Sequence, residues 1–379
     1  NAFPGRERRA SPLPGGHSGE GMFGRERGKD MLKAGLVGVT GYTGMELARI
    51  LAGHPAMKLV MATSRQEAGK RLDELYPFLR GLPGGDVIVR EADAAALSAA
   101  CDVVFLAVPH GVAMEMGAAL YDAGARVVDL SADFRLRDAA VYEKWYGTPH
   151  SRAGYLDKAV YGLPELRAEE IGRTRLVANP GCYPTASILG LYAALKNGLI
   201  RTDDIIIDAK SGTTGAGRKA VVSSLYCEVA DSFRPYNIGG KHRHTPEIEQ
   251  ELSAAAGTSV TVSFNPHLLP VSRGILATIY TKLTSPLAQA DVQALYEDFW
   301  KDSPWVRVLP AGRLPETRNV RGTMFCDIAV TVDERTGRLI ITSAIDNLCR
   351  GASGQAVANA NLMFGLPVET GLNFAPLVP

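Results

Sequence analysis

The strongest constraint on the fold is a short apolar strand that leads into a glycine-rich turn and then into a helix. Residues 36–39 predict the strand, residues 38–44 the turn and residues 45–51 the helix. Glycines let the backbone approach a pyrophosphate closely, and the N-terminus of a helix attracts an anion. The spacing G-x-x-G-x-x-G departs from the usual G-x-G-x-x-G, so the turn alone is equally compatible with a purely structural role.

Alternating strand and helix patterns follow this turn. Apolar, β-branched runs at residues 58–63, 87–90, 103–108 and 126–130 predict strands, and residues 111–122 predict a helix. This alternation is typical of a parallel sheet with helical crossovers, which binds its ligands beyond the carboxyl ends of the strands. We therefore predict an α/β fold with a dinucleotide-binding domain over residues 31–178, whose cofactor contacts include Gly38, Thr40, Gly41, Tyr42, Thr43, Gly44 and Pro109.

The end of the second predicted strand indicates which dinucleotide binds. An enzyme that prefers NAD usually has an acidic residue there, which binds the ribose 2′-hydroxyl. This chain instead has Ser64 and Arg65, a hydroxyl and a guanidinium that suit a 2′-phosphate. NADP is the predicted cofactor, with an exposed Arg65 that binds no ligand as the alternative.

A second motif, Asn-Pro-Gly-Cys-Tyr-Pro-Thr at residues 179–185, places Cys182 on a turn before an apolar helical run at residues 186–195. Backbone N–H groups and the helix dipole favour the thiolate at such a position, and Pro184 suits a first helical turn. Cys182 is therefore the predicted nucleophile. Most cysteines in soluble proteins are small buried hydrophobes, which is our interpretation of Cys101, Cys227, Cys326 and Cys349.

A polar cluster at residues 239–247 precedes a helix predicted from about residue 246 to 256. His242 and His244 stand there beside two cations and Glu247. An imidazole titrates near neutral pH, so we predict acid–base catalysis beside Cys182, with a structural role for one histidine as the alternative. No third ligand has suitable spacing, so no metal is predicted.

Two further segments extend the predicted site. A strand at residues 204–209 leads into a glycine-rich loop at 211–218, which contains Gly212 and Arg218. A strand at 339–343 leads to Asn347 and then to a helix of small residues at 356–363. We expect that helix to pack on the first domain and to bring Asn347 and its neighbours to the nicotinamide.

Composition limits the class of partner and the compartment. The formal net charge is +1, so no broad field indicates nucleic acid or an anionic membrane. Five scattered cysteines without metal spacing predict a reducing compartment, and no apolar run approaches membrane-spanning length, so we expect a cytoplasmic protein. Residues 1–30, rich in Gly, Pro and Arg, are interpreted as a disordered leader, an upstream extension or a targeting segment, with Met31 as a possible start.

The motifs at residues 38–44, 179–185, 242–247 and 346–348 together resemble those of the N-acetyl-gamma-glutamyl-phosphate reductases, within the aspartate-semialdehyde dehydrogenase-like superfamily. The resemblance runs from about residue 31 to the end. It implies a Rossmann-type domain completed by a helix at about 347–364, and an α+β catalytic domain of the glyceraldehyde-3-phosphate dehydrogenase-like kind at 179–346. It also implies a homo-oligomer, a dimer or tetramer.

The activity that the resemblance implies is reduction of N-acetyl-glutamyl 5-phosphate by NADPH through a Cys182 thioester. His244 is then the acid–base catalyst, His242 and Glu247 orient substrate or imidazole, and Arg135 and Arg218 are candidates for the phosphate. Reductases of aspartyl phosphate or of a carrier-linked aminoadipyl phosphate remain open alternatives. Two other classes are an NADP-sensing regulator without catalysis and a cysteine hydrolase, neither of which uses all of these motifs.

Overall fold

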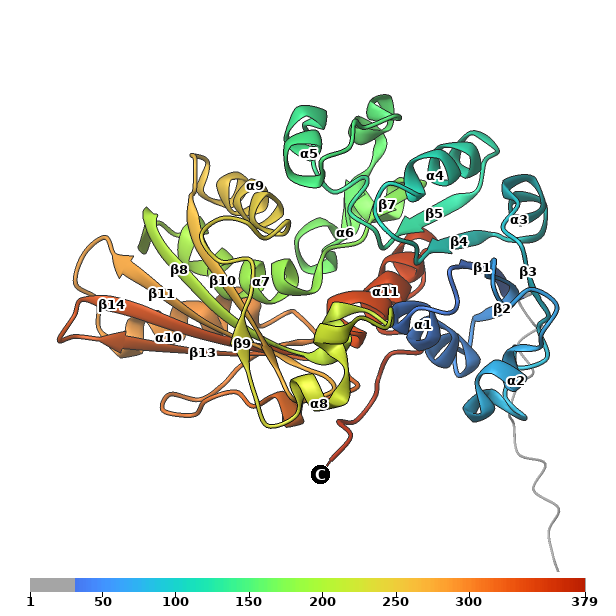
Figure 1. Cartoon of the computed structure of the whole chain (residues 1–379). Coiled ribbons are helices and arrows are strands. Elements are labelled where there is room, and N and C mark those ends of the chain that lie inside the picture. The colour runs from blue at the N-terminus through green and yellow to red at the C-terminus, as the bar shows by residue number, and fades with distance from the viewer. Residues whose placement is uncertain (1–30, 379) are drawn as a thin grey trace, which may run out of the picture. The chain divides into compact units, whose positions relative to one another are not determined.

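The structure, a computed structural model, describes residues 31–378, so the leader predicted at residues 1–30 lies outside the described residues. It is an α/β fold built on two seven-stranded sheets (Figure 1). The strand order is β3-β2-β1-β4-β5-β7-β6 in the first sheet and β12-β13-β14-β11-β8-β10-β9 in the second. The first sheet is parallel throughout, and the second is mixed.

The first sheet reverses its strand order at β1, which pairs with β2 on one side and β4 on the other. A crevice at such a reversal is the usual place for a ligand in a parallel sheet. The strands are β1 (Leu32–Val37), β2 (Met57–Thr63), β3 (Val89–Arg90), β4 (Val103–Leu106), β5 (Arg126–Asp129), β6 (Val160–Tyr161) and β7 (Leu176–Ala178).

Helices cover both faces of the first sheet. Successive residues of a strand point to opposite faces, so each strand contributes to two cores. Leu36 and Phe105 share a core with α1 and α11, whereas Val37 and Val104 share one with α3 and α4. The helices around this sheet are α1 (Tyr42–Ala52), α2 (Leu72–Leu75), α3 (Ala94–Ala100), α4 (Ala113–Asp122), α5 (Ala139–Tyr146), α6 (Pro164–Arg173) and the C-terminal α11 (Gly354–Met363).

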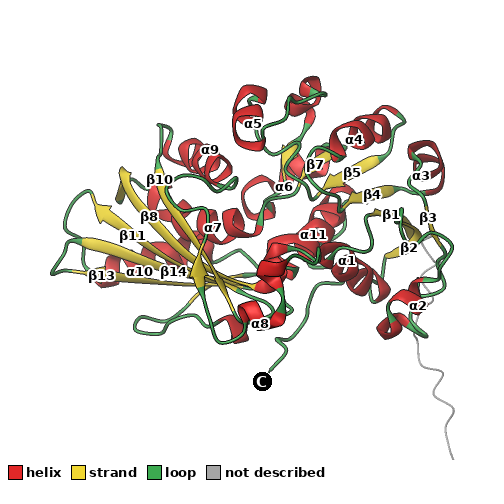
Figure 2. Ribbon diagram, viewed as in Figure 1, coloured by secondary structure: helices red, strands yellow, loops and turns green. Residues whose placement is uncertain are grey.

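The second sheet has helices on one face (Figure 2). Ile205 and Ile207 of β8 are buried against α7, whereas Ile206 points to the other face and is 37% exposed. Helix α7 is apolar all round and buried along most of its length, as expected of a central helix. The elements are β8 (Ile200–Gly212), β9 (Arg234–Pro235), β10 (Val262–Leu269), β11 (Ile275–Leu283), β12 (Val306–Val308), β13 (Cys326–Asp333), β14 (Arg338–Ile345), α7 (Cys182–Lys196), α8 (Tyr226–Val229), α9 (Thr245–Ala256) and α10 (Gln289–Trp300).

The chain also contains short helical turns of the 3₁₀ and π types. A π-helix, Cys349–Ser353, leads directly into α11. The 3₁₀ turns are Pro77–Leu79, Ala153–Lys158, Thr213–Ala216, Val222–Ser224 and Thr317–Asn319. Within the described part of the chain, none of the helices combines the length and apolarity that crossing a membrane requires.

One expectation about cysteines was wrong. Cys101, at the end of α3, is buried as expected. Cys227, expected to be buried, is exposed because the four-residue helix α8 lies on the surface. Cys326 and Cys349 are buried, as expected.

Candidate functional site

The glycine turn between β1 and α1 has one open position between two crowded ones. A Cβ on Gly38, whose φ is +89°, would lie 2.3 Å from the Ala107 carbonyl oxygen, and one on Gly44 would lie 2.3 Å from the Gly38 oxygen. A Cβ on Gly41, the N-cap of α1, would meet the Gly38 oxygen at 3.9 Å, which is ordinary contact. Helix α1 has neither a side-chain cap nor an acidic residue in its first turn, so its N–H groups and the open backbone fit a pyrophosphate.

Three strand ends meet around this turn. The N–H groups of Gly38 and Val39 both donate to the Thr63 oxygen at 3.1 Å, so the turn rests on the end of β2. Ser64 and Arg65 come next in the chain; Ser64 is half-buried and Arg65 is exposed. Exposed Pro109 lies just beyond the end of β4. Thr40, Tyr42 and Thr43, within the turn and the first residues of α1, are half-buried.

Arg218 lies against the glycine turn. Its Nη1 donates to the Thr40 oxygen and to Tyr76 Oη, each at 3.0 Å, and Tyr76 Oη donates to the Val39 oxygen at 3.0 Å. The substrate role expected for Arg218 stays a prediction, and this position beside the turn also suits a phosphate of the cofactor. The interaction spans 178 residues of sequence, which is why local patterns did not indicate it.

Gly212 and Asn347 hold two loops together. A Cβ on Gly212 would lie 2.8 Å from both the Arg273 nitrogen and the Val271 oxygen, so the glycine is needed for the approach of two backbones. Asn347 Oδ1 accepts from Gly274 N at 2.8 Å, and its Nδ2 donates to Thr214 Oγ1 at 2.9 Å. Asn347 is buried and keeps one amide hydrogen free of these two bonds.

Cys182 is the first residue of α7 and is half-buried. Burial raises the pKa of its thiol to about 11, although the N–H of Tyr183 and the charge of Arg135 act in the opposite direction. The expectation that the helix terminus alone favours the thiolate is therefore wrong for this site, because desolvation outweighs the helix N–H groups. The site holds a thiol, which needs a base.

His244 supplies an imidazole beside that thiol. Its Nε2 lies 2.6 Å from the place a Cβ on Gly181, the residue before Cys182, would occupy. Burial, together with the adjacent His242 ring and the charge of Arg135, lowers the pKa of His244 well below its usual value, so the ring is neutral. Its Nδ1 is buried without a hydrogen-bond partner among the described residues. A neutral imidazole can accept a proton from a thiol.

His242 has a different task within the same pair. Its Nδ1 accepts from the backbone N–H of His244 at 3.1 Å, which places its ring proton on Nε2 and orients that N–H as a donor. The centroids of the His242 and His244 rings are 4.9 Å apart. Burial and the charge of Arg243 lower the pKa of His242 to about 4, so it also stays neutral.

Glu247 and Arg135 fix the turn that bears the nucleophile. Glu247 Oε1 accepts from Gly181 N at 2.8 Å and from Tyr161 Oη at 2.9 Å, and its Oε2 accepts from Arg135 Nη1 at 3.2 Å. Arg135 Nε donates to the Asn179 oxygen at 2.8 Å. Both residues are buried, Glu247 at 1% and Arg135 at 6% exposure. They therefore hold the Cys182 turn from the interior of the protein.

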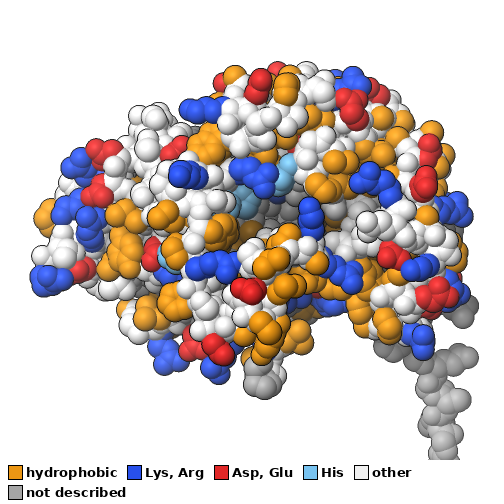
Figure 3. Space-filling view, in the orientation of Figure 1, with side chains coloured by type: hydrophobic (Ala, Val, Ile, Leu, Met, Phe, Trp, Pro, Cys, Tyr) orange, Lys and Arg blue, Asp and Glu red, His pale blue; other side chains and the backbone are white. Residues whose placement is uncertain are grey.

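Sequence patterns did not single out His110, Tyr146 and Arg243, the three residues that we call the mouth of this site. His110 Nδ1 accepts from Ala132 N at 3.0 Å, and its ring lies 5.2 Å from that of Tyr146. The guanidinium of Arg243 lies 5.4 Å over the same Tyr146 ring. The available signals were the place of His110 at a strand end and of Arg243 between two histidines. Figure 3 shows histidine side chains beside basic ones near the middle of this face.

The π-helix connects the thiol with the glycine turn. A Cβ on Gly351 would lie 2.7 Å from the Cβ of Cys182, and Ser353 Oγ donates to the Thr43 oxygen at 2.8 Å. Cys182 and the glycine turn therefore lie on two sides of one five-residue segment. Within residues 31–378, no three His, Cys, Asp or Glu side chains are grouped so as to hold a metal ion.

Comparison with known families covers both sheets. A model described as the semialdehyde dehydrogenase NAD binding domain matches residues 33–174, and one described as the semialdehyde dehydrogenase dimerisation domain matches residues 182–347. The first match contains the glycine turn, and the second begins at the candidate nucleophile.

Two groups of proteins are similar to the whole chain. N-acetyl-gamma-glutamyl-phosphate reductases from Desulfotalea psychrophila and Geobacter sulfurreducens are each 52% identical over 349 residues, 92% of this chain and all of theirs. Aspartate semialdehyde dehydrogenase II from Vibrio cholerae, complexed with ASA, has a TM-score of 0.68 at 16% identity and covers 89% of this chain and 99% of its own. The Candida albicans enzyme with NADP has a TM-score of 0.67 at 17% identity, with coverages of 88% and 99%. The two structures show a shared fold.

Proposed function

The chain belongs to the N-acetyl-gamma-glutamyl-phosphate reductase family, and we propose that it reduces N-acetyl-glutamyl 5-phosphate to N-acetyl-glutamate 5-semialdehyde with NADPH, releasing phosphate. This step belongs to arginine biosynthesis by way of ornithine. The observation that carries the proposal is the π-helix that touches both Cys182 and the glycine turn. A nucleophilic thiol beside a dinucleotide turn has a use in reduction of an acyl group, whereas a hydrolase has no use for the turn.

Cys182 and His244 perform the covalent step. His244 takes the thiol proton while Cys182 Sγ attacks the acyl carbon, so that an S–C bond forms, the bond from carbon to the phosphate oxygen breaks and phosphate leaves. NADPH, when bound, supplies the hydride that reduces the acyl carbon. Cys182 then departs as the thiolate, the carbonyl of the aldehyde re-forms, and a proton returned through His244 restores the thiol. The backbone N–H of Cys182, at the N-terminus of α7, can stabilise the oxyanion.

The cofactor is assigned to the residues around the glycine turn. Gly38, Gly41 and Gly44, with the turn residues Thr40, Tyr42 and Thr43, would hold the pyrophosphate, and Pro109 would line the crevice beside it. Arg65, exposed at the end of β2 and without an ion pair among the described residues, would bind the 2′-phosphate with Ser64. Arg218 would add a second cation. Gly212 and Asn347 would shape the nicotinamide side.

The substrate is assigned to the mouth above His242 and His244. Arg135 and Glu247 act from below as positioning residues, since their polar atoms bind the Cys182 turn. Arg243 is exposed and stacks on Tyr146, so its guanidinium is a candidate for an anionic group of the substrate. The His242 Nε2–H is a donor beside the same mouth.

The direct test is the Cys182→Ser variant. It should abolish turnover and leave NADPH affinity nearly unchanged, because a serine hydroxyl is a far poorer nucleophile than a cysteine. Turnover would be followed by NADPH oxidation, and affinity by cofactor fluorescence. Residual turnover within about tenfold of wild type would show that Cys182 is not the nucleophile.

Three substrates need to be compared because related enzymes share this mechanism. The reverse reaction would be assayed with N-acetyl-glutamate semialdehyde, aspartate semialdehyde and a carrier-linked aminoadipate semialdehyde. The highest kcat/KM should belong to the first. A higher kcat/KM for either of the other two semialdehydes would show that it, and not N-acetyl-glutamate semialdehyde, is the preferred substrate.

We further propose that the enzyme acts in the cytoplasm as a homo-oligomer. All five cysteines are free, which suits a reducing compartment. Val222, Tyr226 and Phe233 are 72%, 83% and 70% exposed, more apolar surface than single scattered side chains explain. The exposed face of the second sheet, with Ile206, is a further surface for a second copy. Sedimentation equilibrium would decide between monomer, dimer and tetramer.

A further inference from the structure

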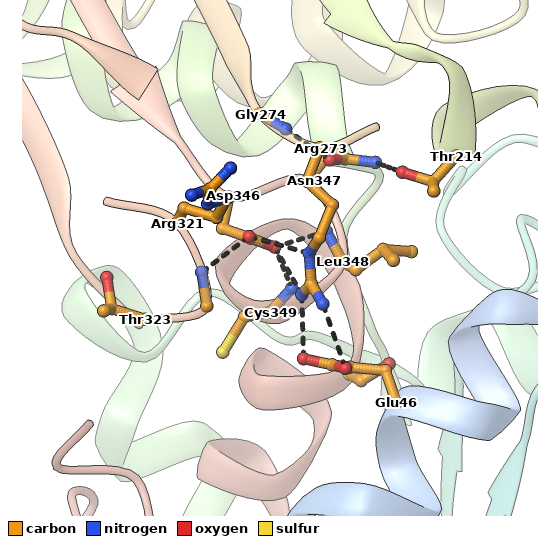
Figure 4. Close-up of polar contacts among 12 residues, drawn as sticks. Glu46, Thr214, Arg273, Gly274, Arg321, Thr323, Asp346, Asn347, Leu348 and Cys349 are labelled. Atoms are coloured by element: carbon orange, nitrogen blue, oxygen red, sulfur yellow. Dashed lines mark hydrogen bonds and ion pairs between the residues drawn. The ribbon is translucent and has the colours of Figure 1, made fainter. Parts of the chain in front are cut away.

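An arginine in the loop between β10 and β11 joins elements of both sheets through two buried carboxylates (Figure 4). Arg273 Nη1 and Nη2 donate to Glu46 Oε2 and Oε1 at 3.2 and 2.8 Å. Its Nε and Nη2 donate to Asp346 Oδ2 and Oδ1 at 2.9 and 2.8 Å. Glu46 belongs to α1, which begins at the glycine turn, and Asp346 follows β14. One guanidinium therefore links the helix of the glycine turn to the chain that enters the π-helix.

Asp346 organises the start of that π-helix. Its Oδ1 accepts from the backbone N–H groups of Leu348 and Cys349 at 2.9 and 2.7 Å, and its Oδ2 accepts from Gly322 N at 2.7 Å. The side chain is fully buried. The same carboxylate therefore connects Arg273 to the backbone of the π-helix.

The pairing of Glu46 points to a role beyond helix stability. Within α1, Arg49 already donates to both Glu46 oxygens, at 3.0 and 2.8 Å, so the carboxylate has a local partner. The guanidinium of Arg273, 227 residues further along the chain, donates to the same two oxygens. Glu46 is 3% exposed, so the surrounding structure has to hold this arrangement in one geometry.

The π-helix makes the arrangement relevant to the reaction. Its Gly351 lies against Cys182, and its Ser353 is hydrogen-bonded to Thr43 in the first turn of α1. The residue after Arg273 is also involved, since Gly274 N donates to Asn347 Oδ1. Turns of the π type are rare and occur frequently at functional sites.

We propose that Arg273 is a positioning residue: by holding Glu46 and Asp346 together, it sets the distance between the bound NADPH and Cys182. The inference rests on the proposed function, because it places NADPH at the glycine turn. Arg273 acts through α1 and the π-helix, and it takes no part in the transfer of atoms.

The test removes the charge of the link with α1, together with one of its two acceptor oxygens, and keeps the rest of the network. Glu46→Gln retains the shape of the side chain and the pair between Arg273 and Asp346. We expect NADPH affinity to fall about tenfold, the size of a lost charge-assisted hydrogen bond, and kcat to fall as well. The rate of Cys182 alkylation by iodoacetamide without cofactor should stay within about twofold of wild type, because the thiol site itself is intact.

A second variant and a matched control separate positioning from stability. Arg273→Lys keeps one charge but cannot bridge two carboxylates with a planar fork, so it should show the same pattern. Arg307, which binds the buried Asp327 with Nε and Nη2 at 2.6 and 2.9 Å, is the control. Arg307→Lys should lower stability and leave NADPH affinity and kcat unchanged.

Two results would overturn the inference. One is NADPH affinity and kcat within about twofold of wild type in both Glu46→Gln and Arg273→Lys. The other is an equal loss in Arg307→Lys, which would mean that any buried ion pair has this effect. A wild-type enzyme that neither binds NADPH nor reduces the acyl phosphate would instead refute the proposed function.

Discussion

Glu247→Gln is the most informative single change, because it alters one charge beside the turn that bears Cys182, the proposed nucleophile, and little else. The carboxylate accepts three hydrogen bonds, from Gly181 N, Tyr161 Oη and Arg135 Nη1, at 2.8, 2.9 and 3.2 Å. A glutamine oxygen can keep the first two. Its NH₂ group then faces Arg135 Nη1, donor against donor, and the buried guanidinium loses its ion-pair partner. Removing one partner of a buried ion pair costs about 3–5 kcal/mol.

The measurement is the free energy of unfolding from urea titration at one protein concentration, together with kcat. Stability should fall by about 3–5 kcal/mol, and kcat should fall because Gly181 directly precedes Cys182. Tyr161→Phe is the matched control: it removes only one hydrogen bond to the same carboxylate, worth about 1.5–3 kcal/mol. A loss for Glu247→Gln below about 1 kcal/mol would refute the view that this charge holds the turn.

Three other variants test separate parts of the molecule. Burial, with the neighbouring Asp133, raises the pKa of Asp129 to about 7, so the native state keeps a proton that the unfolded chain loses above about pH 4. Stability should therefore fall as pH rises from about 4 to 7, and Asp129→Asn should remove that slope, gaining up to about 4 kcal/mol at pH 8 in denaturant titrations. Arg218→Ala should weaken NADPH binding about tenfold with little change in the KM for acyl phosphate; the reverse pattern would return Arg218 to the substrate. Gly351→Ala places a Cβ 2.7 Å from that of Cys182, so it should cost about 1–3 kcal/mol and lower kcat; unchanged turnover would contradict this contact.

The parts of the site that sequence could indicate are those with local causes. The crowding at Gly44 comes from Gly38 and Val39, a few residues away, and the turn at Cys182 is fixed by Gly181 and the start of α7. Their glycines and cysteine are therefore visible as short motifs, and the strands with strong apolar patterns were found to within a few residues. The predictions for individual site residues remain proposals.

The parts that sequence could not indicate depend on distant partners. Arg218 meets Thr40 across 178 residues, and Arg273 meets Glu46 across 227. No local pattern distinguishes such an arginine from a solvated one. Burial is the other hidden quantity: the helix terminus at Cys182 predicted a low thiol pKa, and the desolvation that reverses it arises only when α7, α9 and the π-helix surround the residue.

The charge states of Cys182 and His244 before a substrate binds bear on the proposed covalent step. With the pKa of Cys182 raised to about 11 and that of His244 lowered below its ordinary value, the proton stays on sulfur before a substrate binds. After burial, the pKa of His244 is lowered by the charges of neighbouring groups, Arg135 and Arg243 among them. An acyl phosphate brings negative charge to the same mouth, which raises the pKa of His244 and that of the Cys182 thiol alike. The proton therefore leaves sulfur as the S–C bond to the electrophile forms, and not before.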